Sequence, residues 1–313
     1  MLRLNQKIFI AFSTVYFIAA LPAKAQQWNY DGLNDITGAA EVSFTGGINS
    51  FLGDIGGNKG EGAPFIKDFT FKTIRPLLGV SLSYNINRWA AVNAGINFTQ
   101  VTDADSLINN TGELERWRYY RNLSFRSNIF EVYAGATFYP TMYFEKEYEL
   151  RKFVPFVSVG IGVFHFNPQA KLNGEWINLQ PLRLEGQGFP EYPDRKPYSL
   201  TGFYIPASIG VKYYLNNKFA VSTGFNVRKT FTDYIDDIST TYIDPQLFSK
   251  YFTPEKAAIA TQLYSRSLTP WKVKPDILKA NPDNKDSYLT FYIALSIKLH
   301  KVIPFYYPNI PHR

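Results

Sequence analysis

Residues 76–86 read PLLGVSLSYNI, and apolar side chains occupy every second position from Leu78 onward. An alternation with period two places alternate side chains on opposite faces of an extended strand. The next run, residues 92–99 with the sequence VNAGINFT, repeats the alternation, and Asn87 and Arg88 form the connection. A connection this short predicts an antiparallel hairpin.

The same period predicts six further strands, which makes eight in all. They are expected near Glu41–Phe51, Asn128–Tyr139, Phe153–Phe166, Gly202–Leu215, Phe219–Val227 and Leu289–Leu299. An even number of alternating antiparallel strands is typical of an up-and-down barrel. The expected fold class is therefore all-β, an eight-stranded antiparallel barrel.

The second face of these strands separates a membrane barrel from a soluble one. A soluble sheet shows water a face rich in Lys and Glu, whereas these strands show mainly Gly, Ser, Asn, Thr and Ala. Small residues suit the crowded interior of a narrow barrel, and charge on a lipid-facing position would cost about 2–4 kcal/mol at mid-membrane. The charges in the small-residue phase are therefore expected in the lumen, and they are Glu131, Lys212, Arg228 and Lys298.

Connection lengths point the same way. Short links follow Ile86 and Leu215, and the link 140–152 is intermediate, whereas the links 52–74, 100–127, 167–201 and 229–287 are long. Transmembrane barrels alternate short periplasmic turns with longer extracellular loops. The pattern predicts long extracellular loops and a mature chain with both termini in the periplasm.

The first residues predict export. Arg3 and Lys7 precede an apolar run from Ile8 to Leu21, and Ala23-Lys24-Ala25 follows. This is the pattern of a secretory signal peptide over residues 1–25, cleaved between Ala25 and Gln26. An uncleaved anchor is the alternative, but the run is shorter than the roughly twenty residues of a spanning helix. The expected organisation is a signal peptide, a barrel with loops over 26–299, and a periplasmic tail over 300–313.

Composition excludes several classes of function. The chain has no cysteine, which excludes disulfides, cysteine nucleophiles and thiolate-bound metal centres. The formal net charge is +7, and basic and acidic residues are mixed along the chain. A nucleic-acid partner would require concentrated positive charge, so none is expected. No cofactor motif occurs, and no cofactor is expected.

His165 is the one candidate for catalysis, because it ends the fifth strand in the lipid-facing phase. A lipid A deacylase of the barrel type is expected to carry His-x-Ser, but the context here is Phe164-His165-Phe166-Asn167. An interfacial packing or hydrogen-bonding role is favoured, and the chain is not expected to be an enzyme.

The last long loop is expected to be ordered. Pro254 begins a short predicted helix that extends to about Ser267, and Ile259, Leu263 and Trp271 favour a packed cap. Acidic residues near the start of the loop are weak candidates for a hard cation such as Ca²⁺. The interpretation favoured for them is turn formation and pairing with Arg228 or Lys229, and they are Asp233, Asp236, Asp237 and Asp244.

At this loop the chain resembles a known family. The most specific block is RKTFTDYIDDIS, residues 228–239, and 121–127 (RNLSFRS), 160–168 (GIGVFHFNP) and 184–188 (LEGQG) accompany it. These segments resemble the PorG-like outer-membrane barrels of Bacteroidota. The matching positions in the first block include Arg228, Lys229, Thr230, Phe231, Thr232, Asp233, Tyr234, Asp236 and Asp237.

The resemblance implies a component of the type IX protein secretion machinery, or a relative of one, in which the barrel anchors a periplasmic ring. The expected location is the cell outer membrane, and the expected partners are outer-membrane lipid and periplasmic secretion-machinery proteins. The tail from Lys301 is a candidate docking segment for such proteins, although a frayed terminus is the alternative. A passive structural or adhesin-like barrel and a lipid A-modifying hydrolase remain alternative functions.

Overall fold

The computed structural model describes residues 36–56, 71–108, 112–144, 152–268 and 274–299. The chain divides into two units, Met1–Asn34 and Asp35–Arg313, and all described residues belong to the second. The predicted signal peptide with its Ala25–Gln26 cleavage site, Trp271 and the tail 300–313 lie outside the described residues.

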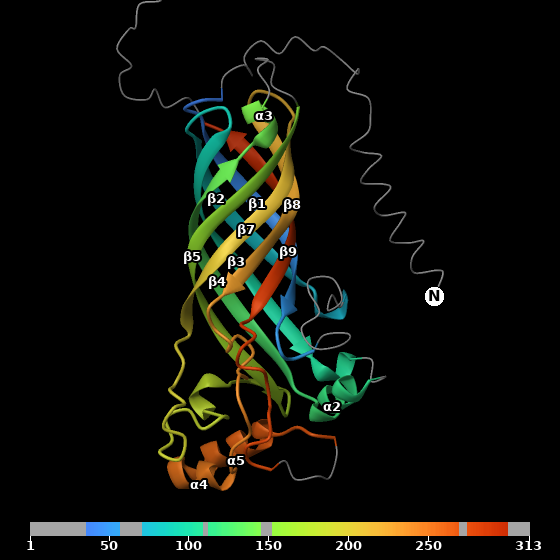
Figure 1. The fold of residues 1–313 in the computed structure, drawn as a ribbon, viewed down its shortest axis with the longest axis vertical. Coiled ribbons are helices and arrows are strands. Elements are labelled where there is room, and N and C mark those ends of the chain that lie inside the picture. The colour runs from blue at the N-terminus through green and yellow to red at the C-terminus, as the bar shows by residue number, and fades with distance from the viewer. Residues whose placement is uncertain (1–35, 57–70, 109–111, 145–151, 269–273, 300–313) are drawn as a thin grey trace, which may run out of the picture. The chain divides into compact units, whose positions relative to one another are not determined.

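Eight strands of the described chain close into an antiparallel barrel, as the sequence predicts. Pairing of β1 with both β2 and β9, and of β4 with both β3 and β5, leaves no open edge in the barrel wall. Figure 1 shows the strands crossing obliquely around one axis. The wall strands are β1 (Ala40–Leu52), β2 (Arg75–Asn85), β3 (Ala90–Ala104), β4 (Ser124–Phe138), β5 (Phe153–Leu172), β7 (Thr201–Tyr214), β8 (Phe219–Thr230) and β9 (Ser287–Lys298).

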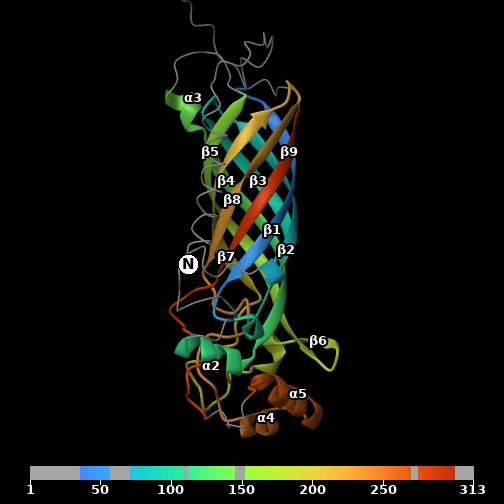
Figure 2. The ribbon, with the colours of Figure 1, turned by 90° about the vertical axis from the view of Figure 1, so that its right-hand side faces the viewer.

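Three strands are longer than their alternation predicts. β3, β4 and β5 continue past the apolar region, and β5 pairs beyond the barrel with a short strand, β6 (Glu175–Asn178), that the sequence analysis missed. Figure 2 shows the β5–β6 hairpin projecting sideways at the long-loop end, beyond the barrel wall. The outward-facing positions in these extensions are mainly polar, for example Gln100, Arg126 and Gln169, so they lack the apolar alternation that marks a lipid-facing strand.

The two faces of the wall follow the predicted phases. Outward apolar side chains are strongly exposed, for example Leu78 at 67%, Ile161 at 73% and Phe203 at 68%. Inward positions carry small or polar residues, among them Ser81, Asn97 and Ser208, which line the lumen. Among the described residues no second layer covers this apolar surface, which is the face that a transmembrane barrel presents to hydrocarbon.

The two shortest turns owe their form to asparagine. Asn87 Oδ1 accepts hydrogen bonds from the backbone N–H groups of Trp89 and Ala90, at 2.9 and 2.8 Å. Asn216 Oδ1 accepts from the N–H groups of Lys218 and Phe219, at 2.8 and 2.9 Å. A side chain that caps its own turn in this way replaces a longer loop.

The longer connections carry the helices. α2 (Glu113–Arg121), α4 (Gln246–Tyr251) and α5 (Pro254–Tyr264) lie at the long-loop end, and α3 (Pro140–Phe144) lies at the short-turn end (Figure 1). α5 starts at the predicted proline, with the Thr253 hydroxyl accepting from Lys256 N–H, but it ends three residues before the predicted Ser267. Single 3-10 turns occur at Phe71–Thr73, Asp105–Leu107 and Gln180–Leu182. None of the described helices has the length and apolar character needed to cross a membrane.

Candidate functional site

The lumen holds an ion pair that links opposite walls. Arg228 Nε lies 2.7 Å from Oε1 of Glu131, and both side chains are buried. Glu131 also accepts hydrogen bonds from Asn97 Nδ2 at 2.7 Å and from the Tyr288 hydroxyl. Arg228 donates to the Thr290 hydroxyl at 2.6 Å. Each charge therefore has both a counter-charge and polar partners, which is the arrangement that a buried pair requires.

A second ion pair lies nearer the short-turn end. Lys212 Nζ contacts Glu41 Oε2, and both groups are buried. Glu41 is a lumen charge that the sequence analysis missed, because it stands at the very start of the predicted strand, before the apolar alternation is established. Lys298, which was also expected in the lumen, is half-buried. It lies opposite Glu41 in the register of β1 and β9. Between the two ion pairs a polar cavity of about 140 Å³ remains, lined mainly by Ser, Asn, Thr and Tyr side chains.

Aromatic side chains fill the opposite end of the lumen. Phe51 and Phe125 pack edge to face at 4.8 Å, and Phe164 stacks on Phe166 at 5.3 Å. Ile235 and Ile238 from the last loop pack onto this cluster. With the aromatic cluster at one end and two ion pairs below it, the lumen is an interior packed by side chains and not an open channel.

The long loops form an ordered cap, defined here as residues 179–200, 231–268 and 274–286. Phe189, Ile243, Phe248, Ala260 and Leu263 form part of its apolar core, in which α4 and α5 pack against the turn around Gln180–Leu182. Tyr264 closes this core through a hydrogen bond from its hydroxyl to the carbonyl of Ile243. The last loop is thus ordered by packing, as its apolar residues predict.

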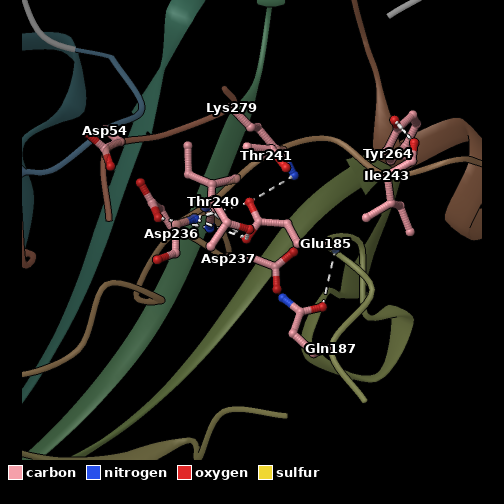
Figure 3. Close-up of polar contacts among 12 residues, drawn as sticks. Asp54, Glu185, Gln187, Asp236, Asp237, Thr240, Thr241, Ile243, Tyr264 and Lys279 are labelled. Carbon is pink, nitrogen blue, oxygen red and sulfur yellow. Dashed lines mark hydrogen bonds and ion pairs between the residues drawn. The ribbon is translucent and has the colours of Figure 1, made fainter. Parts of the chain in front are cut away.

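Glu185 joins two of the sequence segments that carry the family resemblance. Its carboxylate accepts hydrogen bonds from the backbone N–H groups of Ser239 and Thr240 and from the Thr240 hydroxyl, at 2.9–3.2 Å. Lys279 Nζ lies 3.8 Å away (Figure 3). Gly186 and Gly188 have positive φ angles of 74° and 78°, which a glycine adopts without steric cost. The glycines of LEGQG therefore form the tight turn that presents Glu185 to the last loop.

Arg121 connects the third of these segments to the same region. Its guanidinium donates to both carboxylate oxygens of Asp105 at 2.8 Å, and the pair is buried. It also donates to the carbonyl oxygens of Asp54 at 2.7 Å and Lys279 at 2.5 Å. One planar cation with five donors can satisfy several loops at once. Arg121 thereby holds the first, second and last long loops together.

The aspartates of the last loop are buried at the base of this cap, and the expected pairing with Arg228 or Lys229 is wrong. Arg228 pairs with Glu131 instead, and Lys229 Nζ donates to the Lys285 carbonyl. Asp236 accepts from the N–H groups of Ile55 and Ile238, both at 3.2 Å. Asp237 accepts from the Tyr198 hydroxyl at 2.5 Å. Neutral donors therefore take the place of the expected counter-charges.

Burial changes the acidity of these groups. Burial raises the pKa of Asp233 to about 7 and that of Asp237 to about 7. Burial, followed by the charge of Asp286, raises the pKa of Asp236 well above its usual range. Burial, followed by the charge of Asp233, likewise raises the pKa of Asp286 well above its usual range. Carboxyl groups in this environment keep their protons to a higher pH than exposed aspartates do.

The candidate cation ligands and His165 are placed as follows. Asp244 accepts from the Gln246 N–H at 3.0 Å, so it caps the start of α4. Among the residues that the structure describes, no three His, Asp or Glu side chains are grouped so that they could hold a metal ion. His165 is exposed on the outward face of β5, with Nδ1 3.3 Å from the Thr201 hydroxyl.

No protein-family model and no curated protein matches the chain. Among solved structures, the barrel is similar to Neisserial surface protein A, with 9% identity, a TM-score of 0.37, and 84% of this chain and 98% of that chain covered. It is also similar to Ail of Yersinia pestis, with 8% identity, a TM-score of 0.33, and 84% of this chain and 99% of that chain covered. A third similar structure is Outer Membrane Protein W of E. coli, with 14% identity, a TM-score of 0.30, and 82% of this chain and 97% of that chain covered. These likenesses concern the fold alone.

The chain is an outer-membrane β-barrel. Its wall is closed by its own strand pairing, and its outward face is apolar over strands from every part of the barrel. A closed barrel satisfies all of its backbone groups without water, and it is the β-structure that can span a bilayer. Long loops gathered at one end and short turns at the other match the asymmetry of outer-membrane barrels.

Proposed function

We propose that this chain is a non-enzymatic anchoring barrel, and that it is a component of the type IX secretion machinery or a relative of one. The observation that carries the proposal is the blocked lumen. Side chains and two ion pairs occupy the interior, and the cap packs onto the long-loop end. A barrel of eight strands has little space left for transport. We therefore place the function of this protein at the two ends of the barrel and on its outward face.

The resemblance to PorG-like barrels supplies the specific role. The segments that carry it meet at the cap base, where Arg121, Glu185 and Asp236 make buried hydrogen bonds. These contacts order the extracellular loops, so the shared residues favour a common architecture of the cap. The link to the type IX machinery is inferred from the resemblance alone.

The short-turn end is the surface that a periplasmic partner would reach. Trp89 and Tyr143 pack edge to face at 5.4 Å there, and Tyr143 and Phe144 of α3 are exposed. Exposed aromatic residues are common at both membrane interfaces and protein interfaces. Together with the tail from Lys301, this end is our candidate for partner docking.

The surroundings of His165 support a non-enzymatic barrel over the alternative of a lipid hydrolase. Its ring nitrogen is engaged with the Thr201 hydroxyl, and its cross-strand neighbours are Phe130 and Thr201. A hydrolytic histidine acts together with a nucleophile or an activated water oriented by a third group. The proposal predicts unchanged lipid A in a strain that carries His165→Ala.

A deletion strain tests the role in secretion. We expect loss of exported type IX cargo from the medium and its accumulation in the periplasm, with recovery when the full chain is restored. A second strain that carries the chain ended after Leu299 separates the barrel from its tail. Normal export in the deletion strain would leave a passive structural barrel as the better interpretation.

A further inference from the structure

The outward face of β3, β4, β5 and β6 becomes polar where the apolar region ends. Strand register places Gln100, Asn128 and Asn167 in one row and Arg126, Gln169 and Asn178 in the next. Phe98, Phe130 and His165 occupy the row before them, at the edge of the apolar surface. We call the side chains of Gln100, Asn128, Asn167, Gln169 and Asn178 the amide ladder.

The members of the amide ladder hold one another in place. Gln100 Nε2 donates to Asn128 Oδ1 at 2.7 Å. Asn178 Oδ1 accepts from both Asn167 Nδ2 at 3.0 Å and Gln169 Nε2 at 2.7 Å. Each primary amide has two donor hydrogens and an acceptor oxygen, so these bonds leave hydrogen-bonding capacity directed away from the barrel. The ladder is an ordered row of donors and acceptors at the protein surface.

A tryptophan and two cations continue the ladder. The Arg126 guanidinium lies 3.8 Å from the centre of the Trp176 ring, and Arg126 Nε donates to Gln169 at 2.8 Å. Lys171 is paired with Trp176 in the β5–β6 hairpin and is exposed. Trp176 remains 39% exposed even with the guanidinium stacked on it. An apolar ring is thus fixed beside two positive charges.

The other face of the hairpin explains why this surface is fixed. Ala170 and Leu179 belong to the apolar core of the cap, and Leu172 and Ile177 pack against it. Alternation along a strand then directs Gln169, Lys171 and Trp176 away from the protein. The hairpin therefore does not need the exposed indole for its own packing.

We propose that the amide ladder, Arg126, Lys171 and Trp176 bind the core saccharide of an outer-leaflet glycolipid, that is, the sugars beyond its lipid A anchor. The surface continues the lipid-facing phase of the same strands beyond the apolar region, so the occupant is joined to the membrane. At the long-loop end that position is the headgroup layer of the outer leaflet.

The chemistry of the surface matches a charged saccharide. Neighbouring sugar hydroxyls donate and accept in pairs, as primary amides do. The C–H face of a pyranose is apolar and packs on an aromatic ring. Arg126 and Lys171 would meet phosphate or carboxylate groups on the sugars, with Arg126 able to form a two-pronged contact. A bare phospholipid offers a phosphate but no row of hydroxyls.

Nanodiscs allow a direct test with the mature full chain. The barrel is placed in phosphatidylcholine nanodiscs that contain either rough lipopolysaccharide, which carries core sugars, or lipid A without core sugars. Native mass spectrometry then counts the glycolipid molecules that stay bound. We expect Trp176→Ala to weaken binding of the rough lipopolysaccharide about tenfold, which corresponds to about 1.4 kcal/mol. Asn178→Ala should weaken it in the same direction.

Trp89→Ala is the matched control, because Trp89 is 38% exposed but belongs to the short-turn end. It should leave binding unchanged, and none of the three variants should alter binding of lipid A. An equal loss of binding with Trp89→Ala would overturn the proposal. Equal binding by the wild type, Trp176→Ala and Asn178→Ala would also overturn it. Retention of lipid A that depends on Trp176 would also overturn it, because the core sugars would then not be the recognised part.

Discussion

Arg228 Nε and Glu131 Oε1 lie 2.7 Å apart inside the barrel, although β8 and β4, which carry them, are not neighbours in the sheet. The contact crosses the lumen and fixes the distance between two walls. Both groups are buried, so the pair stabilises the fold mainly because each charge compensates the other. The attraction between them contributes less to the free energy of unfolding. This distinction sets the expected result of mutating one partner or both.

Removal of one partner should destabilise the barrel strongly. Arg228→Met leaves Glu131 buried without its counter-charge, and we expect the free energy of unfolding to fall by about 3–5 kcal/mol. Urea titration of the barrel refolded in liposomes measures this loss. The double variant Arg228→Met with Glu131→Leu should recover most of it.

Lys229→Met is the control for this experiment. Lys229 is the next residue along β8 but is exposed, so the expected change is about 0.5 kcal/mol or less. If the double variant were as unstable as the single one, the ion pair would contribute through its specific geometry and not through charge compensation.

The filled lumen makes a second prediction about transport. Liposomes that contain the wild-type barrel should swell in a small sugar such as arabinose no faster than liposomes without protein, because the aromatic cluster and the ion pairs block the path. An open porin in matched liposomes serves as the positive control. Rapid swelling would mean that the cap and lumen open in a bilayer, and the anchoring proposal would lose its main support.

A third prediction concerns the turn that presents Glu185. Gly186 has a φ of 74°, and a Cβ atom there would lie 2.8 Å from the ring of Tyr192. Gly186→Ala should therefore displace Glu185 from Ser239 and Thr240. We expect faster proteolysis within 231–268 while the strands stay resistant. Gly174→Ala is a matched control, since Gly174 also has positive φ but has open space around it. Equal protection in both variants would contradict a role for Glu185 in ordering the last loop.

The strands were predictable from the sequence because their signal is local. Leu78, Val80 and Leu82 face outward for the same reason that they alternate with Gly79 and Ser81, and no distant residue alters that pattern. The ends of β3, β4 and β5 were not predictable in this way. Beyond the apolar region the outward residues of these strands are mainly amides and cations. A sequence with such residues is hard to distinguish from that of a polar loop.

Partners inside the site were beyond reach for a different reason. Glu41 contacts Lys212 across 171 positions of sequence, and Asp236 bonds to Ile55 across 181. Such contacts depend on how the barrel closes and how the loops pack, and the local alternation along the chain does not reveal them. The sequence predicted pairing of the loop aspartates with Arg228 or Lys229 and also placed Arg228 in the lumen. The lumen placement is confirmed, and it is the reason that Arg228 pairs with Glu131 and not with an aspartate of the loop.

The buried aspartates should make cap stability depend on pH. Asp233 and Asp237 have ordinary pKa values of 3.8, which rise to about 7 in the folded protein. A raised pKa means that the folded state binds the proton more tightly than the unfolded state. The stabilisation is therefore complete below about pH 4 and is lost as the pH rises toward 7. Ionisation of several aspartates also brings like charges together at the cap base.

Asp233→Asn tests this linkage, because an amide keeps the size of the protonated acid but cannot ionise. Hydrogen exchange in residues 231–268 should accelerate between pH 5 and pH 8 in the wild type relative to the variant at the same pH, a comparison that cancels intrinsic exchange chemistry. Asp283→Asn changes an exposed aspartate of the same loop and should behave as the wild type does. A ratio of wild type to Asp233→Asn that stays constant across this range would mean that Asp233 keeps one protonation state in the folded cap, and the cap would then owe its order to Glu185, Arg121 and apolar packing alone.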